Sequence, residues 1–380
     1  LLWCALLGSL RLSIAAEAPP VTISKSDAIS VSMATLGGSD GAAITKIVQS
    51  DLAVSGYFTM TSSAGAAFVV AGTSSGEGLQ GKVTDHGRQT VVSRTYSGDA
   101  RSKAHQFSDD IIETLTGTRG FANTKIAFVA TRSGRKEIYV ADANGSNVQQ
   151  ITRDNNISVA PALSPDGRRL AYTGYKSGYA DVYEINLGSG ARERIVKFPG
   201  TNSGAAFSPD GGRIALTLSK DGNPELYTVG AGGGGARRLT QTRGVESSPT
   251  WSPDSAEIIY SSDDRGSPQL YRISSGGGSA QMLPAGHSYC TEPNWSPDGK
   301  KVAFSVREGG EFQVAVLELQ GGGSRVVSGG GDAQDPVWAA DSRHLFFCQS
   351  GGLYLLDVQT GRKTKVLDGL GKISEPSSSR

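Results

Sequence analysis

The chain has 380 residues, of which 51 are glycine and 15 are proline, and only 19% of its residues are charged. Glycine is far above its usual share of ~7%, which disfavours an architecture of long helices, and the length favours more than one domain. Lys and Arg number 37 against 36 Asp and Glu, so the net charge is only +1. No overall field would hold such a chain on nucleic acid or an anionic membrane, and we expect no nucleic-acid partner.

The N-terminus has the features of an export signal. Residues 1–10 (LLWCALLGSL) form an apolar block that is too short to span a bilayer, which needs ~20 residues. The small residues Ala15 and Ala16 follow at the place of a cleavage site. We therefore predict a signal peptide over residues 1–16, a mature chain that begins near Glu17, and a protein that does not span the membrane.

Cysteine is scarce in the mature chain. Cys290 and Cys348 are the two cysteines that follow the predicted signal peptide. They are too few for a disulfide framework and too far apart for a metal knuckle. We expect both to be small buried apolar residues.

Residues 17–120 are predicted to form a small α/β domain that does not share the later repeat. Apolar spacing of about 3.6 residues predicts one helix that Asp40 caps and a second helix later in this region. Alternating or short apolar runs predict the strands. The predicted helices cover residues 40–52 and 104–115, and the predicted strands cover residues 28–35, 67–70, 81–84 and 89–96.

The remainder of the chain contains an internal repeat of about 44 residues. A Ser-Pro-Asp-Gly turn stands at residues 164–167 and is followed by a short β-type run. The same turn recurs with small changes, and it has degenerated to Ala-Ala-Asp-Ser in the last copy. The later copies begin at Ser208, Ser252, Ser296 and Ala339.

Each repeat unit is expected to be a four-stranded antiparallel meander, because period-two alternation is separated by glycine-rich hairpin turns. Six units packed around an axis form a β-propeller, predicted over residues 121–380. The unit that starts at Lys125 lacks its own first strand, and a matching Ser-Glu-Pro strand appears at residues 374–377. We expect this C-terminal strand to close the ring, although Ser378 replaces the Trp of other units.

Catalytic patterns are weak. Residues 72–76 match G-x-S-x-G, but a glycine-rich turn into another strand lacks the strand-to-helix elbow that this mechanism needs. No histidine shows metal-ligand spacing or lies beside a plausible nucleophile in the sequence, and His105 and His344 are expected to be structural. The Asp of each Ser-Pro-Asp turn is expected to cap that turn. We predict no catalytic residue, no enzyme activity and no cofactor.

One variable column precedes the proline of each unit's first strand. If these strands line the channel, three neighbouring units place carboxylates near one mouth, with Glu246 close by. Such a cluster favours a cation, Ca²⁺ included, or a basic partner segment, and the alternative is a set of solvated carboxylates. The sequence alone does not decide whether a metal ion binds at this cluster. The column consists of Ala160, Gly204, Ser248, Glu292, Asp335 and Glu375.

The repeat resembles that of the TolB family. Its features include PNWSPDG at residues 293–299, KVAF at 301–304 and RRLT at 237–240. The arrangement of a signal segment, one α/β domain with FSDDI at residues 107–111, six units and a terminal Ser-Glu-Pro strand narrows the resemblance. A rival family of propellers joined to serine peptidases needs a further domain that this sequence does not contain.

The resemblance implies a soluble periplasmic adaptor of the Tol-Pal envelope system, which maintains the outer membrane and assists its constriction at cell division. It implies that the propeller channel binds the lipoprotein Pal through a surface with Glu292, Asp335 and Glu375, and we place Glu246 in that surface. Other outer-membrane proteins are further candidate partners.

The resemblance also implies that the mature N-terminal segment binds TolA. In this chain the segment would be residues 17–26, with Glu17, Val21 and Ile23, although Pro19-Pro20 stiffens it. A propeller that senses a ligand or cation is the alternative function.

Overall fold

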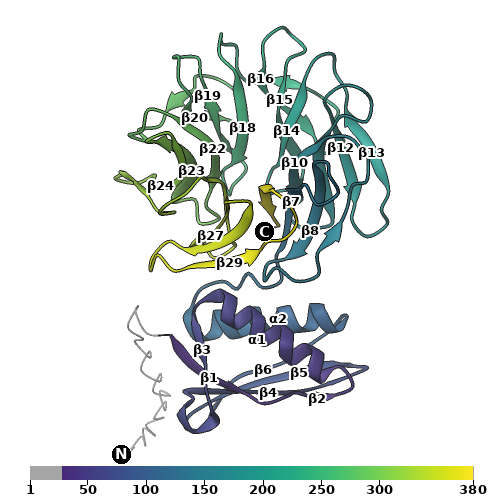
Figure 1. Cartoon of the computed structure of the whole chain (residues 1–380), viewed down its shortest axis with the longest axis vertical. Coiled ribbons are helices and arrows are strands. Elements are labelled where there is room, and N and C mark those ends of the chain that lie inside the picture. The colour runs from purple at the N-terminus through teal and green to yellow at the C-terminus, as the bar shows by residue number, and fades with distance from the viewer. Residues whose placement is uncertain (1–27, 380) are drawn as a thin grey trace, which may run out of the picture.

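The computed structural model of the chain describes residues 28–379. It contains a small α/β domain and a six-bladed β-propeller, so the predicted fold class is confirmed (Figure 1). The two helices lie on the face of the small sheet that is turned toward the propeller (Figure 1). Within residues 28–379 no helix combines the length and the apolar character needed to cross a membrane.

The N-terminal domain is a mixed sheet in the order β3-β1-β4-β5-β6, with β2 beside β4. Strand β1 runs parallel to both β3 and β4, whereas β4, β5 and β6 form an antiparallel meander. The short strands β2 and β3 were not predicted. The elements are β1 (Ile29–Met33), β2 (Gly37–Gly38), α1 (Gly41–Ser55), β3 (Phe58–Met60), the 3₁₀ helix η1 (Ser63–Gly65), β4 (Phe68–Ser75), β5 (Gly78–Asp85), β6 (Thr90–Tyr96) and α2 (Ala100–Thr116).

The two helices begin differently. Asp99 caps α2 by accepting a hydrogen bond from the Ser102 amide at 2.7 Å. Asp40 precedes α1 but makes no side-chain cap bond there, so the predicted cap is wrong. Its carboxylate instead lies 2.8 Å from Lys103 Nζ. Asp40 therefore ties the start of α1 to α2.

Five blades are meanders of four consecutive strands. The first blade contains β10 (Ser158–Leu163), β11 (Arg169–Gly174), β12 (Asp181–Asn186) and β13 (Arg192–Val196), and the second contains β14 (Asn202–Phe207), β15 (Arg213–Leu218), β16 (Glu225–Gly230) and β17 (Arg237–Arg238). The third contains β18 (Glu246–Trp251), β19 (Glu257–Ser262), β20 (Gln269–Ser274) and β21 (Gln281–Met282). The fourth contains β22 (Cys290–Trp295), β23 (Lys301–Glu308), β24 (Glu311–Glu318) and β25 (Ser324–Val326), and the fifth contains β26 (Ala333–Trp338), β27 (His344–Gln349), β28 (Gly352–Asp357) and β29 (Lys363–Leu367).

The sixth blade joins the two ends of the propeller chain. It consists of β30 (Ile373–Ser378), β7 (Lys125–Ala130), β8 (Glu137–Asp142) and β9 (Gln149–Gln150). Beyond the strand, Ser379 exchanges backbone and side-chain hydrogen bonds with Lys125. Ser378, which stands where other blades carry Trp, donates from its hydroxyl to the Trp338 carbonyl at 3.0 Å. A polar contact with the neighbouring blade thus replaces the missing aromatic ring.

The repeated turns explain the constant spacing of the blades. In the first copy, the Ser164 hydroxyl donates to Asp166 Oδ1 and accepts from the Arg169 amide, and the same Asp oxygen accepts from the Arg168 amide. The copies at Asp210, Asp254 and Asp298 repeat the Asp contacts. The prediction that this Asp caps its turn is confirmed.

The predicted burial of both mature cysteines is confirmed. Cys290 and Cys348 are free thiols that are packed inside blades four and five. Burial raises the pKa of Cys290 to about 12, which leaves the thiol protonated and unreactive at neutral pH.

Candidate functional site

The six innermost strands enclose a cavity of about 360 Å³ along the propeller axis. Prolines and tryptophans form much of its wall, and these rigid side chains lose little entropy when a partner covers them. The six residues of the variable column all line this cavity, as the prediction of channel-lining strands requires. Its wall includes Pro161, Pro249, Pro293, Pro336, Pro376, Trp251, Trp295 and Trp338.

A β-bulge places the variable column in the channel. In β10 the register with β11 passes from Val159↔Thr173 to Ala162↔Ala171, so the inner strand carries one extra residue, and the other five inner strands do the same. Each bulge holds its column residue at positive φ. The φ values are 49° for Ala160, 65° for Gly204, 52° for Ser248, 54° for Glu292, 56° for Asp335 and 55° for Glu375.

A bulged residue cannot place its backbone N–H in its own ladder, so the amide needs an acceptor from the preceding blade. The Gly204 amide reaches the hydroxyl of Thr173 at 3.3 Å, and the Asp335 amide reaches that of Ser305 at 3.1 Å. Both hydroxyl residues occupy the same register position on a second strand.

Carboxylates replace this hydroxyl where the second strand lacks one. The corresponding residues of blades five and six are Cys348 and Val129, which are poor acceptors or none. There the Glu375 amide donates to Asp335 Oδ2 at 2.8 Å, and the Ala160 amide donates to Glu375 Oε2 at 2.6 Å. The two carboxylates therefore hold neighbouring blades together.

Glu292 belongs to the same chain of contacts. Its Oε2 accepts from the Ser305 hydroxyl at 2.6 Å and from the Asp335 amide at 3.2 Å. Burial, and then the neighbouring charge of Glu292, raises the pKa of Asp335 to about 8. Burial also raises the pKa of Glu375, although the bond from the Ala160 amide opposes it. The three carboxylates are thus bonded and half-buried, and the alternative of freely solvated carboxylates does not describe them.

Glu246 does not join this group. It is the first residue of β18, it is fully buried, and it does not line the cavity. Its Oε1 accepts from the hydroxyls of Thr242 and Ser262, each at 2.8 Å. Burial raises the pKa of Glu246 to about 7. The strand places Glu246 two residues before the bulge, so its side chain packs inside the blade.

The predicted N-terminal segment lies outside the described residues, and the described residues contain no group of side chains arranged as a metal site. Glu17, Val21, Ile23 and the signal peptide precede residue 28, so the structure does not describe them. Across residues 28–379, no group of three His, Cys, Asp or Glu side chains is arranged to hold a metal ion.

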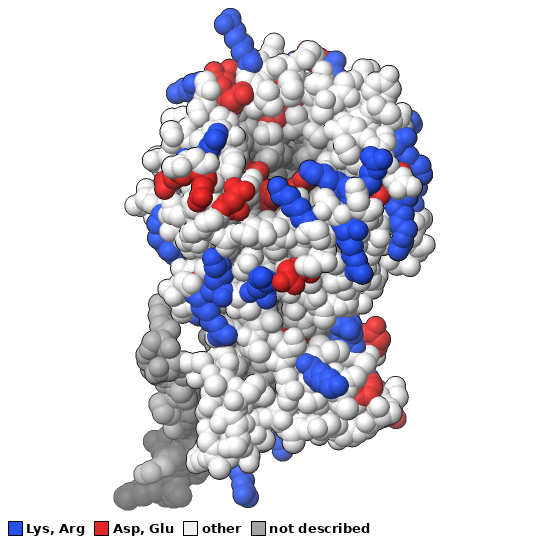
Figure 2. Space-filling model, in the orientation of Figure 1, with Lys and Arg blue, Asp and Glu red and all other residues white. Residues whose placement is uncertain are grey.

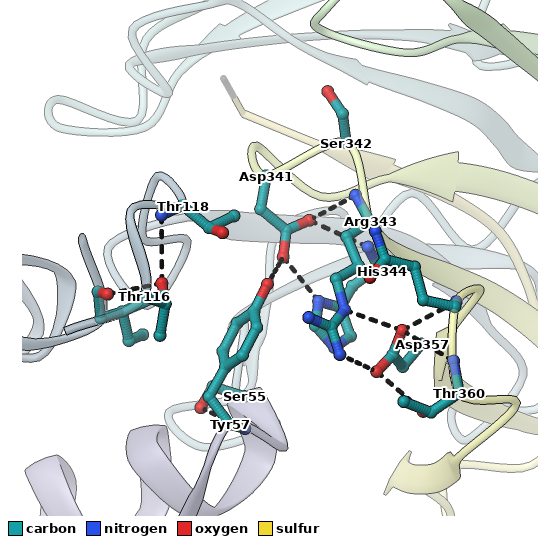
Figure 3. A network of polar contacts seen from close by, with 12 residues as sticks. Ser55, Tyr57, Thr116, Thr118, Asp341, Ser342, Arg343, His344, Asp357 and Thr360 are labelled. Atoms are coloured by element: carbon teal, nitrogen blue, oxygen red, sulfur yellow. Dashed lines mark hydrogen bonds and ion pairs between the residues drawn. The ribbon is translucent and has the colours of Figure 1, made fainter. Parts of the chain in front are cut away.

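The degenerate last turn is a docking point for the N-terminal domain (Figure 3). With Ala339 in place of Ser, Asp341 Oδ1 accepts both the Arg343 and His344 amides itself. The other oxygen, Oδ2, bonds His344 Nδ1 and, at 3.2 Å, the hydroxyl of Tyr57 from the N-terminal domain. The structural role predicted for His344 is confirmed, whereas the contact with Tyr57 was not predicted.

A second buried contact joins α2 to the sixth blade. His105 lies between Asp51 Oδ2 at 2.8 Å and Asp142 Oδ2 at 3.3 Å, and Arg101 also bonds Asp142, at 2.7 Å. Burial alone would lower the pKa of His105, but the bonds to Asp142 and Asp51 outweigh it and raise the pKa to about 9. The imidazole is therefore charged at neutral pH and links the domains, as its predicted structural role requires.

One histidine lies beside a hydroxyl of a residue that is distant in the sequence. His287 Nε2 is 2.9 Å from Ser324 Oγ, and its Nδ1 is 2.8 Å from Glu308 Oε1. The Ser324 hydroxyl also donates to the Ala285 carbonyl at 2.5 Å. This backbone acceptor competes with His287 Nε2 for the serine proton, so the contact differs from a Ser-His-acid triad, in which the serine hydroxyl donates to the histidine.

The G-x-S-x-G segment is also structural. Its serine, Ser74, lies near the end of β4, which turns directly into β5. The hydroxyl is buried and accepts from Lys103 Nζ at 2.9 Å. Strand-to-strand geometry and this buried contact exclude a nucleophile elbow at Ser74.

The fold and the channel define the class: a six-bladed propeller with an open axial cavity, preceded by a docked α/β domain. The family model described as the TolB beta propeller domain matches residues 112–380. The chain belongs to the TolB family. The resemblance found in the sequence is thereby confirmed.

Individual relatives agree with this placement. The chain is 49% identical over 87 residues to the Tol-Pal system protein TolB of Geobacter sulfurreducens, across 22% of this chain and 20% of the relative. It is 32% identical over 157 residues to the Tol-Pal system protein TolB of Bordetella pertussis, across 34% of this chain and 36% of the relative. The matched segments thus span well under two thirds of these relatives.

The likeness of fold extends further than these segments. The crystal structure of TolB from Acinetobacter baumannii superposes with a TM-score of 0.83 at 25% identity, covering 93% of this chain and 97% of that chain. The N-terminal domain and the propeller are thus both shared with a solved TolB.

The carboxylate contacts predict that two substitutions of Glu375 lower the free energy of unfolding by different amounts. Glu375→Ala leaves the Ala160 amide without its acceptor and should lower the free energy of unfolding by about 1–2 kcal/mol. Glu375→Gln keeps an amide oxygen in that place and should cost less. Urea unfolding of both variants at pH 7 measures the difference, and equal losses would contradict the role of Glu375 as an amide acceptor.

The His105 contact predicts a pH dependence of stability. The pKa of His105 is raised above ~6.5, the unfolded value, so its stabilising contribution is complete below about pH 6.5 and is lost as the pH rises through about 9. The loss should be on the order of 3 kcal/mol in the unfolding free energy.

Denaturant unfolding between pH 6 and 9.5 measures this effect. His105→Gln should remove most of the pH dependence in that window. His86→Gln, which changes an exposed histidine of the β5–β6 turn, should keep it. The same slope in all three proteins would refute the contribution of His105.

Proposed function

We propose that this chain is a non-enzymatic adaptor of the Tol-Pal system that acts in the periplasm. Membership of the TolB family and relatives named Tol-Pal system protein support this assignment. In this proposal the propeller binds Pal through its channel and the N-terminal segment binds TolA, in support of outer-membrane integrity and constriction at division.

The observation that carries the proposal is the channel surface. Six bulged strands and a rigid wall of prolines and tryptophans form a cavity of about 360 Å³, and bonded carboxylates fix its rim on one side. A pre-organised concave surface favours the binding of a protruding partner segment, because little entropy is lost on association. The two candidate catalytic serines, Ser74 and Ser324, are held in structural contacts.

Calorimetric titration of the full chain with the soluble domain of the same organism's Pal tests the function. Replacing Glu292, Asp335 and Glu375 by Gln, Asn and Gln removes the ionisable carboxyl groups but keeps oxygen acceptors for the bulge amides. If these carboxyl groups contact Pal, the triple variant should bind roughly 10-fold more weakly or worse. Unchanged affinity would keep the adaptor function and discard these three site residues.

The same titration distinguishes the adaptor from the alternative function, a propeller that senses a ligand or cation. Heat on addition of calcium chloride, with none on addition of Pal, would favour a cation-binding propeller. The proximity of Glu292 and Asp335 is the feature that supports this alternative. A calcium signal that persists in the triple variant would place the cation elsewhere.

The proposed TolA contact has its own test. Val21→Asp together with Ile23→Asp should weaken binding of the soluble C-terminal domain of TolA by roughly 10-fold or more, because apolar anchors dominate such contacts. The alternate residues Thr22 and Ser24, changed to Ala, provide the matched control. Equal binding by both variants would mean that this segment does not engage TolA.

A further inference from the structure

The strands that line the channel all begin on one face of the propeller, where the loops between strands form a continuous surface. Neighbouring loops are joined by backbone hydrogen bonds of 2.9–3.1 Å. The loops at residues 131–136, 153–157, 175–180, 197–201, 219–224 and 241–245 are linked in this way through the pairs Ser158–Lys136, Tyr175–Ile157, Asn202–Ala180, Ser219–Thr201 and Glu246–Pro224. They cover the sixth, first and second blades.

Basic side chains dominate these loops, and we call this set of side chains the basic crescent. All are exposed except Lys220, which is half-buried. Among the described residues, Lys136 pairs with Glu375 at 3.7 Å and Lys220 pairs with Asp221, while the others form no ion pair. The crescent consists of Arg132, Arg135, Lys136, Arg153, Lys176, Lys197, Lys220 and Arg243.

The few carboxylates within these loops are already engaged. Asp154 bonds Arg192 at 2.7 Å, and its side chain is only 4% exposed. Asp221 pairs with Lys220. The positive charge of the other crescent residues is therefore not neutralised from within the loops.

The opposite half of the same face has the reverse sign. Its loops and the adjoining strand ends contain Arg265, Arg307 and Lys372 among a larger acidic set, and Lys365 pairs with Asp368 of that set at 3.3 Å. Figure 2 shows basic side chains gathered on the side of the propeller where Figure 1 places β12 and β13, and acidic ones on the side of β24. The acidic set consists of Asp263, Asp264, Glu308, Glu311, Asp332 and Asp368.

This pattern separates charge across one face of a chain whose net charge is only +1. A surface of that kind orients a partner of complementary polarity and speeds its encounter. The direct pair between Lys136 and the channel residue Glu375 shows that the crescent meets the channel rim.

Exposed apolar side chains lie among the basic residues of the crescent. Tyr179 is 73% exposed, and Ile157 and Val245 are each 43% exposed. Ile157 and Tyr179 stand in loops that the Tyr175–Ile157 hydrogen bond joins. Tyrosine and arginine are among the residues enriched at the energetic centres of protein interfaces, so this combination points to a protein partner.

We propose that the basic crescent docks the acidic face of a folded protein partner, with Tyr179 as its apolar anchor and the channel beside it. This inference rests on the proposed adaptor function and takes Pal as the partner. It fixes the orientation of the complex, because the acidic side of the partner lies over the first and second blades and a less acidic side lies over the fourth.

Charge reversal tests the proposal. The crescent variant is Arg153→Glu, Lys176→Glu and Lys197→Glu. The control variant is Lys82→Glu, Arg168→Glu and Lys300→Glu, which reverses three exposed and unpaired basic residues in β5 and in the turns at the opposite ends of the inner strands. Exposed substitutions of this kind usually change stability by less than ~0.5 kcal/mol, and thermal unfolding checks that both variants fold.

Affinity for the soluble Pal domain is measured at low and high salt. The crescent variant should bind at least ~10-fold more weakly at low salt and show less salt dependence than the control, which should match the unaltered chain. Tyr179→Ala should weaken binding by roughly 10-fold at both salt concentrations, because an apolar anchor is not screened.

The remaining outcomes separate a failure of the docking surface from a failure of the adaptor function. Equal affinity of the crescent and control variants would overturn the docking surface while the adaptor function stands. Absence of Pal binding by the unaltered chain would overturn both. Binding of the unaltered chain, but not the crescent variant, to vesicles of phosphatidylcholine and phosphatidylglycerol, without an effect of the variant on Pal, would assign the crescent to a membrane surface and overturn the protein docking site.

Discussion

The bulge amides of the innermost strands are the constraint on which the channel depends. Each bulge turns one residue to positive φ, a conformation that costs a non-glycine residue of order 1 kcal/mol, and it takes that residue's N–H out of the ladder. Acceptors from the preceding blade make the arrangement tolerable. Thr173 and Ser305 supply hydroxyls for the Gly204 and Asp335 amides, and Asp335 and Glu375 serve where the second strand has Cys348 or Val129.

This constraint explains the positions of Asp335 and Glu375. They lie in the fifth blade and in the sixth, ring-closing blade, whose second strands carry Cys348 and Val129 in place of a hydroxyl residue. Ring closure therefore depends on more than the strand pairing of β30 with β7, because Glu375 also bonds across to the first blade. The carboxylates on one side of the channel rim therefore also form part of the seam of the propeller.

The sequence was sufficient for the architecture, because the turn chemistry of Ser-Pro-Asp-Gly recurs at a constant spacing and the hydrogen bonds in each turn are local. The roles of the carboxylates as acceptors for the bulge amides could not be predicted from the variable column alone. The residue that decides them, such as Cys348, lies on the next strand, and a bulge leaves no mark in the alternation of apolar residues. Glu246 was misplaced for the same reason, since its distance from the bulge sets the direction of its side chain.

The erosion of the last Ser-Pro-Asp turn has a structural consequence. Loss of the serine hydroxyl at Ala339 leaves Asp341 to accept two amides and frees its second oxygen for His344 and Tyr57. The degenerate copy of a repeat is thus the copy that has acquired a contact outside the repeat. The N-terminal domain docks on blades five and six, whose inner strands carry Asp335 and Glu375. The channel rim and the domain interface therefore share these two blades, and the buried His105 and Asp341 contacts tie the N-terminal domain to the blades that carry Asp335 and Glu375.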